Sequence, residues 1–379
     1  MMTYPARAVV DLGAIAGNVA RLREVAGPAE VMAVVKGDAY GHGLVPVARA
    51  ALGAGATWLG VAQLGEALTL RAAGVDARTL TWLYAPGAPL AEALRADLDL
   101  SVAAPWALDE VVGAARESGV VARVHLKVDT GMGRSGLFLD EWGGLLDAAV
   151  RAQAAGEIDV VGVWSHLASA DDAESGLTAE QTRVFAEAVR RAEDAGAHLE
   201  VRHLANSAGT LAHAATHFDL VRPGIAVVGL SPFGDRTADE LGLTPAMRLE
   251  AELTIVKHAP AGQGVSYGHE YTTSEATSLA VVPLGYADGI PRHAGGAGPV
   301  QVGDTWSRIA GRVCMDQFVL DLGAGANAHA GDVAVLFGSG ADGEPTAADW
   351  ARAADTITYE IVTRLGPRVP RVHVGGRDA

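Results

Sequence analysis

From residue 31 to about residue 235, short apolar runs alternate with longer stretches in which apolar residues recur every three or four positions. The runs indicate buried strands, and stretches such as Gln63–Ala73, Leu108–Ser118, Glu141–Ala155 and Thr178–Ala195 indicate amphipathic helices. Eight runs follow one another: Val31–Lys36, Trp58–Ala62, Thr79–Ala85, Leu98–Ala104, Arg123–Thr130, Val160–Ala168, Val201–Asn206 and Leu220–Gly229. Eight alternations predict an α/β fold with a closed (β/α)₈ barrel, because an open doubly wound sheet usually has fewer strands and a glycine-rich first turn.

After about residue 235, short apolar runs are joined by glycine-rich turns instead. These runs are Leu249–His258, Ser278–Pro283, Val300–Val302, Ser307–Val313, Gln317–Leu322 and Asp332–Phe337. Closely spaced strands with such turns predict a mainly β second domain, with one late helix at about Ala347–Leu365. A further run, Ala6–Asp11, precedes the barrel and its count of eight, and a helix from Leu12 to about Glu24 follows it.

The composition favours a cytoplasmic protein of two domains. A chain of 379 residues is long for one domain, and its formal net charge of −16 disfavours nucleic acid as a partner. No apolar run is long enough to cross a bilayer, and the N-terminal sequence lacks the pattern of a signal peptide. The single cysteine excludes an internal disulfide and is typical of a reducing compartment.

Polar side chains gather at the carboxyl ends of the predicted barrel strands, which is where the active sites of such barrels form. In chain order they are Lys36 on the first strand; Lys127, Asp129 and Arg134 at or after the fifth; His166 on the sixth; Asn206 and Ser207 at the seventh; and Arg222, with Pro223-Gly224, within the eighth. Solvated charges scattered at random would not keep to one end of the strands. The pattern therefore predicts one site at this face.

Lys36 stands where a valine-rich run gives way to the loop 37–43, which contains three glycines. Burial disfavours the charged form of an amine, lowers its pKa and makes it available as a nucleophile or base. A lysine stem at a strand end can also extend to water, and this stretch alone leaves both interpretations open. Tyr40, four residues on, offers a hydroxyl that can bind an oxyanion.

Several longer motifs in a fixed order extend the interpretation. They are AVVKGDAYGHG, HLKVDTGMGR, WSHLASAD, ANSAG, RPGIAVVGLSP, VSYGHEYTT, PLGYADG, GRVCMDQFVLDLG and TITYEIVTRL, and they run from Ala33 to Leu365. In these motifs the chain resembles the bacterial alanine racemases, isomerases that use pyridoxal phosphate. The resemblance implies a barrel at residues 12–235 that binds the cofactor, and a mainly β domain made of residues 1–11 and 236–379.

The resemblance also assigns the contacts of the cofactor. Lys36 matches the lysine that holds pyridoxal phosphate as a Schiff base, through which charge at the substrate Cα spreads into the ring. Arg222 matches the arginine at the pyridine nitrogen; since arginine keeps its proton, that nitrogen stays unprotonated, which suppresses transamination. His203 would support Arg222. The remaining cofactor contacts are assigned to Tyr40, Asn206, Ser207, Gly224, Ile225 and Tyr359.

Racemisation requires a base on each face of a planar carbon, one to remove the proton and one to return it. Lys36 matches one base and Tyr267 the other, with His166 and Arg222 in series beside the tyrosine. The resemblance places four residues of each subunit in the site of its partner: Tyr267, Tyr286, Met315 and Asp316. It therefore implies a homodimer with two shared active sites.

Substrate recognition is assigned in the same way. Arg134 matches the residue that binds the substrate carboxylate, which suits its forked guanidinium, with help from Met315. Lys127 matches a lysine that carbon dioxide converts to an anionic carbamate, which would hold Arg134; an unmodified lysine that binds chloride is the alternative. Tyr286 and Tyr359 would narrow the entrance to admit a methyl side chain. The implied reaction interconverts L-alanine and D-alanine, supplies D-alanine for peptidoglycan and needs no metal.

Three alternatives remain in view. A racemase for serine, lysine or a wider range of amino acids differs only in the width of its pocket. A pyridoxal-phosphate-binding homeostasis protein shares the barrel but lacks a β domain, and the SYGHEY and CMDQF segments argue against it. A decarboxylase of the same architecture needs a C-terminal cysteine motif, whereas Cys314 precedes Met315-Asp316 as in the racemases. Gly37 stands where many relatives have alanine, and it removes no functional group.

Overall fold

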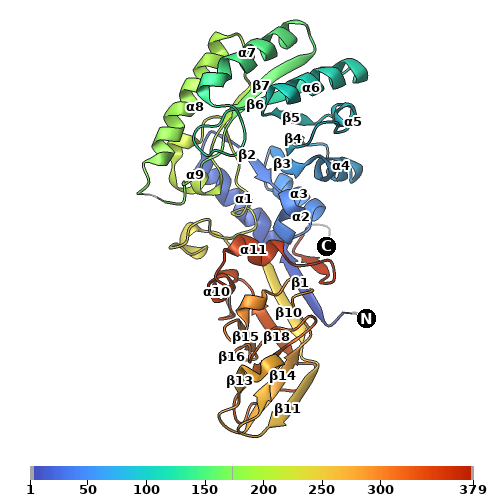
Figure 1. Cartoon of the computed structure of the whole chain (residues 1–379), viewed down its shortest axis with the longest axis vertical. Helices are drawn as coiled ribbons and strands as arrows, with labels where there is room; N and C mark the ends of the chain where they lie inside the picture. Colours follow the sequence, from blue (N-terminus) through green and yellow to red (C-terminus); the bar gives the residue numbers. More distant parts are fainter. Residues whose placement is uncertain (1–3, 173, 377–379) are drawn as a thin grey trace. The chain divides into compact units, whose positions relative to one another are not determined.

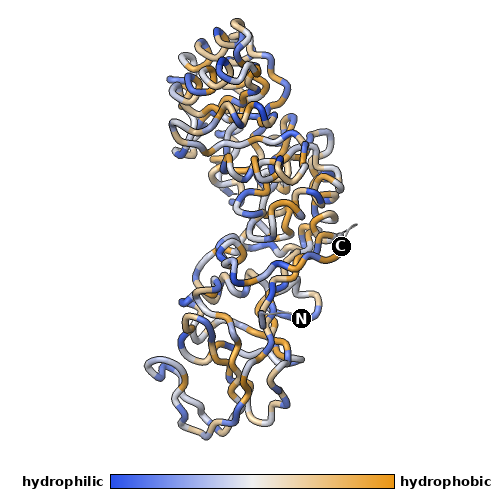
Figure 2. Tube along the Cα trace, turned by 90° about the vertical axis from the view of Figure 1, so that its right-hand side faces the viewer, coloured by the Kyte–Doolittle hydropathy of each residue, from blue (hydrophilic) through white to orange (hydrophobic). Residues whose placement is uncertain are grey.

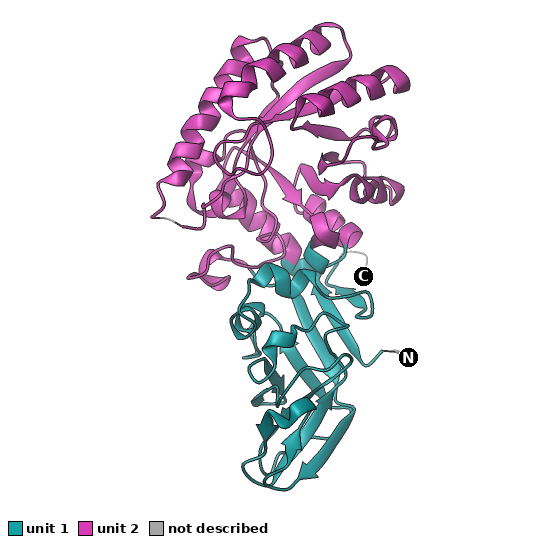
Figure 3. Cartoon of the chain, viewed as in Figure 1, with its two compact units in different colours: residues 1–14, 40–43, 244–379 teal, residues 15–39, 44–243 magenta. Residues whose placement is uncertain are grey.

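The computed structural model describes residues 4–172 and 174–376, which divide into two compact units (Figure 3). The barrel unit comprises Ile15–Ala39 and Leu44–Leu243, and the β unit comprises Met1–Ala14, Tyr40–Gly43 and Thr244–Ala379. Both ends of the chain thus belong to the β unit. Along the whole trace, hydrophobic and hydrophilic residues alternate over short distances (Figure 2), as expected where each element has one buried side.

The barrel unit is built on an eight-stranded parallel sheet in the order β8-β7-β6-β5-β4-β3-β2-β9 (Figure 1). The strands are β2 (Glu30–Val34), β3 (Trp58–Gln63), β4 (Arg78–Leu83), β5 (Asp99–Val102), β6 (Ala122–Lys127), β7 (Ile158–Trp164), β8 (Val201–His203) and β9 (Leu220–Val221). The backbone N–H of Asp219 donates to the carbonyl of Arg202 at 3.1 Å, and that of Arg222 to Ala205 at 2.9 Å. These bonds join the two end strands, so the sheet is nearly closed and the predicted barrel is confirmed.

Helices cover this sheet through apolar stripes. The helices are α1 (Leu12–Ala26), α3 (Leu44–Gly53), α4 (Leu64–Ala72), α5 (Leu90–Arg95), α6 (Pro105–Ser118), α7 (Leu139–Ala154), α8 (Leu177–Asp194) and α9 (Ser207–Ala212). In α7 the buried residues Trp142, Leu145, Leu146, Ala149 and Ala152 recur at three and four positions, which places them on one face. Within the described residues, no helix is long and apolar enough to cross a membrane.

Seven of the eight predicted runs extend past the end of the strand that they contain, so His166 and Asn206 follow β7 and β8 and do not lie on them. β2 ends at Val34, so Lys36 opens the next element, α2 (Lys36–Gly41). β9 ends at Val221, so the prediction that Arg222 lies within the eighth strand is wrong and it follows the strand instead. The physical reason is Pro223, which has no N–H to continue the sheet, and the chain turns directly after it.

The β unit is mainly β, as predicted. Its largest sheet has six strands in the order β16-β15-β18-β10-β1-β19, and a second sheet has the order β11-β14-β17. The strands are β1 (Ala6–Asp11), β10 (Met247–Glu252), β11 (Ile255–Ala259), β12 (Gly264–Val265), β13 (Tyr271–Thr272), β14 (Thr277–Val282), β15 (Pro299–Val302), β16 (Thr305–Arg308), β17 (Phe318–Asp321), β18 (Val333–Phe337) and β19 (Arg371–Val374). β1 lies between β10, which is antiparallel to it, and β19, which is parallel.

Two details of the β unit differ from the sequence prediction. The single run Leu249–His258 is two strands, β10 and β11, which belong to different sheets. The single late helix is two helices, α10 (Ala347–Ala353) and α11 (Thr358–Thr363). Between them Asp355 adopts φ +51°, and this left-handed residue turns the chain out of the first helix.

Candidate active site

Lys36 begins a turn whose backbone is left-handed. From Gly37 to Gly41 every residue of α2 has φ between +52° and +79°. For the three residues with side chains, Asp38 to Tyr40, this conformation costs about 1–2 kcal/mol each. The Glu66 carboxylate accepts the N–H of Gly37 at 2.6 Å, and the Asp38 carboxylate accepts that of Leu44 at 2.7 Å. These bonds hold the strained backbone beside the lysine. Glu66 was not anticipated, because the contact is visible only in three dimensions.

The amine of Lys36 lies in a setting that favours its neutral form. Burial lowers its pKa first, and the positive charges of Arg134 and Arg222 lower it further, against an opposing effect of Glu66. Within the described residues, this amine makes no hydrogen bond and no ion pair. Such an amine is suited to act as a nucleophile or base.

Asp129 organises the loop that carries Arg134. Its carboxylate accepts four backbone N–H groups, from residues 131, 132, 133 and 134, at 2.9–3.1 Å. Burial raises the pKa of this carboxyl, but the four donors outweigh burial and the pKa is lowered. Gly136 closes the loop with φ +103°, and a Cβ there would lie 2.8 Å from the carbonyl oxygen of Lys127. The sequence therefore fixes the backbone of Arg134 through one carboxylate and one glycine.

Lys127 is the last residue of β6 and is buried. Its Nζ lies 4.3 Å from the ring centroid of Trp164. Burial lowers the pKa of Lys127 to about 7, and the nearby charges of Arg134 and Arg222 act in the same direction. Near neutral pH, much of this amine is therefore uncharged.

Arg222 joins two histidines. Its Nη1 lies 3.2 Å from Nδ1 of His203, and its Nη2 lies 3.4 Å from Nδ1 of His166. The same Nη2 donates to the carbonyl oxygens of Ser165 at 2.6 Å and Leu204 at 3.2 Å. Burial lowers the pKa of Arg222 to about 9, and burial followed by the charge of Arg222 holds the pKa of both histidines well below its ordinary value. Both rings are therefore neutral and can accept from the guanidinium.

Ser207 brings the segments after β8 and β9 together. Its Oγ accepts the backbone N–H of Gly224 at 2.9 Å and that of Ala226 at 3.3 Å. Asn206 caps the following helix, since its Oδ1 accepts the N–H of Gly209 at 2.9 Å. Within the described residues the hydroxyl proton of Ser207 has no acceptor, so it is available to an anion. Ile225 is buried beside Gly224.

The sequence analysis did not single out two buried polar residues, Asp99 and His125. Nε2 of His125 lies 3.0 Å from Oδ2 of Asp99, and its Nδ1 lies 2.8 Å from Nε2 of His203. Asp99 is the first residue of β5, DLSV, and His125 lies within β6, ARVHLK, and both side chains are buried. A polar residue in a strand buried on both faces was the signal that could have found them.

The β unit contains the remaining predicted site residues. Tyr40 and Tyr359 lie with their rings edge to face, 6.2 Å apart. The N–H of Tyr286 donates to the carbonyl of Cys314, and that of Ala287 to Met315, each at 3.0 Å, so Tyr286 and Met315 occupy adjacent segments. Asp316 pairs with Arg368 at 2.7 Å.

Three of these side chains are largely open to solvent. Tyr267, in the 3₁₀ turn η3 (Tyr267–His269), is 70% exposed, Met315 is 54% exposed and Tyr286 is 43% exposed. Large apolar side chains left open in this way are typical of a surface that meets a partner.

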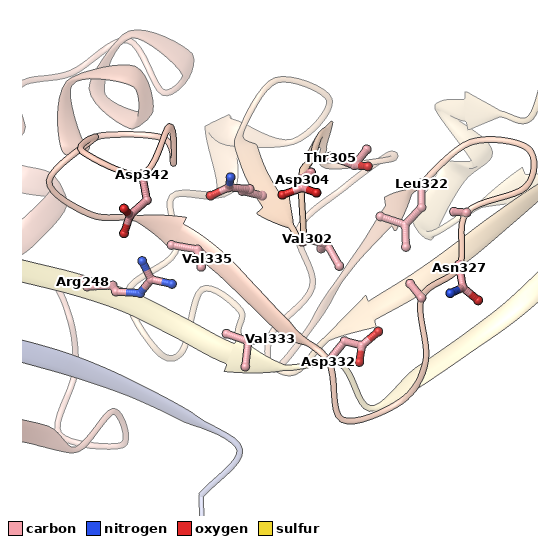
Figure 4. A pocket seen from close by; sticks show the side chains of 14 residues that line it. Arg248, Val302, Asp304, Thr305, Leu322, Asn327, Asp332, Val333, Val335 and Asp342 are labelled. Carbon is pink, nitrogen blue, oxygen red and sulfur yellow. The ribbon is translucent and has the colours of Figure 1, made fainter.

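A depression of about 790 Å³ in the β unit is separate from these residues (Figure 4). Arg248, Asp304, Asp332 and Asp342 line it together with apolar side chains, and Arg248 pairs with Glu250 at 2.9 Å. It contains none of the predicted site residues. In the described parts of the chain, no group of three or more His, Cys, Asp or Glu side chains could hold a metal ion.

Comparison with known proteins identifies the family. Residues 10–232 match the model of the alanine racemase N-terminal domain, and residues 246–373 match that of the C-terminal domain. The chain is 56% identical over 375 residues to an alanine racemase of Salinispora tropica, and the match covers 99% of this chain and all of the relative. Among solved structures, the alanine racemase of D-cycloserine-producing Streptomyces lavendulae is 54% identical, with a TM-score of 0.98 and coverage of 100% of this chain and 99% of that one. The alanine racemase of Streptomyces coelicolor A3(2) is 55% identical, with a TM-score of 0.97 and coverage of 98% of each chain. The resemblance seen in the motifs is confirmed: the chain belongs to the alanine racemase family, a family of isomerases.

Proposed function

We propose that the chain interconverts L-alanine and D-alanine with pyridoxal phosphate as its cofactor. The observation that carries this proposal is the half-buried amine of Lys36, which has no partner in the described residues and whose pKa is lowered by burial and by Arg134 and Arg222. A neutral amine flanked by two guanidinium groups suits an aldehyde that carries a phosphate and a substrate that carries a carboxylate.

The barrel residues fit this cofactor. Lys36 would hold the aldehyde carbon covalently, and the hydroxyl proton of Ser207 would be donated to the phosphate, beside the Gly224–Ile225 backbone and α9. The Nε–H of Arg222 has no acceptor in the described residues and would be donated to the pyridine nitrogen. The family resemblance adds Tyr40, Asn206 and Tyr359. When bound, pyridoxal phosphate would withdraw electrons from the substrate Cα and make its proton removable.

In the proposed reaction Lys36 and Tyr267 act as bases on opposite faces of Cα. The amine of Lys36 would take or return the proton on one face, and the phenol of Tyr267 on the other. The neutral ring of His166, which is held by Arg222, would lie in series with that phenol. His203 would fix Arg222 from its other side.

Arg134 would bind the substrate carboxylate through its forked guanidinium, on a loop already fixed by Asp129. Lys127 would hold Arg134 as a carbamate, because an amine with a pKa of about 7 is nucleophilic enough toward carbon dioxide at neutral pH. The alternative is an unmodified Lys127 beside a bound chloride. Met315 would assist Arg134, and Tyr286 and Tyr359 would limit the pocket to a methyl side chain.

We further propose that the active form is a homodimer in which each barrel, residues 12–235, receives Tyr267, Tyr286, Met315 and Asp316 from the β domain of its partner, residues 1–11 and 236–379. The exposure of Tyr267 and Met315 supports such an interface. The proposed role is to supply D-alanine for peptidoglycan in the cytoplasm.

The test of the reaction is deuterium incorporation at Cα of L-alanine in heavy water, together with loss of optical rotation, on the cofactor-loaded protein. L-Serine and L-lysine are run in parallel. Racemisation of alanine alone, with one deuterium at Cα, is expected; comparable rates with serine or lysine would replace the proposal with a broader racemase. Bound cofactor without exchange on any amino acid would refute it.

Tyr267→Phe tests the second base, with Tyr271→Phe as the matched control. Tyr267→Phe should reduce exchange starting from L-alanine by about 10²-fold or more while the cofactor stays bound. Tyr271, whose hydroxyl donates to Asp321 at 2.7 Å, should tolerate the same change. Equal exchange rates for the two variants would remove Tyr267 from the mechanism.

Mixing two inactive variants tests the shared site. A heterodimer of Lys36→Ala and Tyr267→Phe subunits contains one site with both defects and one site with neither. Co-expression with two different affinity tags should therefore recover about half of the activity per dimer. Sites built within one subunit would each keep one defect, and no activity would return.

A further inference from the structure

Buried polar side chains cross the barrel unit from one end of its strands to the other. Arg222 follows β9 and His203 ends β8, whereas Asp99 is the first residue of β5. His125 on β6 links them, 2.8 Å from His203 and 3.0 Å from Asp99. None of the four side chains is more than 4% exposed. Water therefore does not screen these contacts.

Packing leaves the two rings little freedom. Trp164 is stacked on His203 with the ring planes 3° apart, and Trp58 meets His125 edge to face at 5.5 Å. Opposite His125 the neighbouring strand has Gly162, where a Cβ would lie 2.3 Å from the ring nitrogen Nδ1. The β6–β7 register shifts just before His125, an irregularity that re-aims a side chain.

The two ends of this series fix the direction of every hydrogen bond in it. A carboxylate only accepts, so Nε2 of His125 must carry the proton that it donates to Asp99. At the other end the guanidinium of Arg222 only donates, so Nδ1 of His203 must accept and the ring proton of His203 lies on Nε2. Nε2 of His203 therefore donates to Nδ1 of His125. The requirements of the two ends agree.

Asp99 accepts hydrogen bonds from two arginines as well as from His125. Its Oδ2 accepts from Arg78 at 2.9 Å and its Oδ1 from Arg123 at 3.2 Å. The same two arginines bond Glu200 at 2.7 and 3.0 Å. Charge-assisted hydrogen bonds from two guanidinium groups hold this buried carboxylate in place. Glu200 has no contact with either histidine in the described residues.

We propose that Asp99 is a positioning residue that, through the ring protons of His125 and His203, holds Arg222 in one orientation as a donor toward the active site. The assignment of the ring protons stands on the contacts alone. The consequence of this orientation for catalysis rests on the proposed function, in which Arg222 keeps the pyridine nitrogen of the cofactor unprotonated.

Long-range ¹H–¹⁵N correlation spectra of protein labelled in histidine report the ring protons directly. His125→Gln and His203→Gln variants assign the two signals. In the protein without added cofactor and in the loaded protein, both rings should be neutral with the proton on Nε2. A proton on Nδ1 or a doubly protonated ring at either position would overturn the proposal, and this result needs no Asp99 variant to fold.

Asp99→Asn tests the anchor, and Glu200→Gln is its matched control. Asparagine has one acceptor oxygen where Asp99 has two, so its donors must compete for that oxygen. The His125 Nε2–H resonance should therefore move upfield, or the tautomer of His125 should reverse. The loaded Asp99→Asn protein should also form at least fivefold more pyruvate per racemisation event, since Arg222 is less well held. Glu200→Gln should leave both readouts within twofold of the parent.

The outcomes separate this proposal from the proposed function. If Asp99→Asn behaves like Glu200→Gln in the spectra and in the pyruvate ratio, Asp99 is only structural and the proposal fails. A different result is that the rings are protonated as described and Asp99→Asn shifts their resonances, but the parent protein exchanges no amino acid. In that case the series of hydrogen bonds from Asp99 to Arg222 is supported and the proposed function is not.

Discussion

The two ends of the barrel strands carry similar numbers of charged groups but use them in opposite ways. At the amino-terminal end, Arg78 and Arg123 share Asp99 and Glu200, so positive and negative charges balance. At the carboxyl end the cations are Lys36, Lys127, Arg134 and Arg222, and within the described residues none of them forms a salt bridge.

This difference separates stability from binding. Paired charges at one end satisfy one another and need no ligand. At the other end, burial and then the neighbouring unpaired cations lower the pKa of Lys36 and Lys127. In a chain with a formal net charge of −16, that end is a local concentration of positive charge. It is suited to a ligand that brings its own anions, and substitutions at the two ends should have very different effects.

The largest effect is expected for Lys36→Ala, at the unpaired end. Loss of the amine should lower racemisation by at least ~10³-fold, because one group supplies both the covalent attachment and a base. Borohydride reduction followed by peptide mapping measures the attachment, and the chain has only three lysines, 36, 127 and 257. Lys257→Ala, at an exposed strand, is the control; an adduct that survives on another lysine in Lys36→Ala would contradict the assignment.

Arg134→Lys should have the next largest effect. A lysine keeps the charge but loses the forked pair of donors, so the KM for alanine should rise about tenfold to a hundredfold, as expected for loss of one charge-assisted hydrogen bond. Initial rates over a range of alanine concentrations measure it. Arg116→Lys, at an exposed arginine that pairs with Glu157 at 2.7 Å, should leave KM unchanged. Equal KM values in the two variants would exclude a direct contact of Arg134 with the carboxylate.

Lys127 gives the unpaired end a dependence on pH. Its pKa is about 7 in the folded chain, against 10.5 for a free side chain, so between these values the unfolded chain binds more protons. The free energy of unfolding should therefore rise with pH across this window, by at most ~1.4 kcal/mol per pH unit. Below pH 7 the destabilisation that comes from burying the protonated Lys127 should have reached its full value.

Urea unfolding at pH 7, 8 and 9 in buffer free of carbon dioxide measures this slope, and Lys127→Met should lack the contribution. If the two proteins have parallel profiles, Lys127 is not the neutral amine described.

A second measurement tests the modification of Lys127. Addition of ¹³C-bicarbonate to the parent protein should give a carbamate signal in the ¹³C spectrum that Lys127→Met does not show, whereas chloride binding alone would give none.

The smallest effect is expected at the balanced end. Glu200 is 45% exposed, and Glu200→Gln should change the free energy of unfolding by less than about 1 kcal/mol and activity by less than about threefold. Thermal unfolding and the exchange assay measure both. A loss of activity comparable to that of Arg134→Lys would show that Glu200 acts on the active site, as only Asp99 is proposed to do from this end.

The sequence predicted the barrel well because its signals are local. Eight apolar runs give eight strands, and the carboxyl ends of those runs locate Lys36, Lys127 and Ser207. It could not predict that β9 has only two residues, since that depends on where Pro223 meets the sheet. Nor could it predict the left-handed turn after Lys36, because glycines at 37 and 41 permit the turn but Glu66 holds it from another helix.

The series of hydrogen bonds from Asp99 to Arg222 was not predicted, for the same reason. Asp99, His125 and His203 lie on three different strands, and no spacing along the chain relates them. Each of them by itself is most simply interpreted as a satisfied polar residue in the core. The two distances that join them, and a third from His203 to Arg222, are what suggest a common role.

The position of β1 has a consequence for how the protein is made. This strand is synthesised before the barrel, whereas both of its neighbours, β10 and β19, are synthesised after it. Until β10 and β19 are synthesised, the N–H and C=O groups of β1 have no partners in the sheet. The barrel can form during this time, while β1 is still unpaired. β19 therefore completes the protection of β1, so a nascent chain interrupted before Arg371 would leave β1 as an open edge.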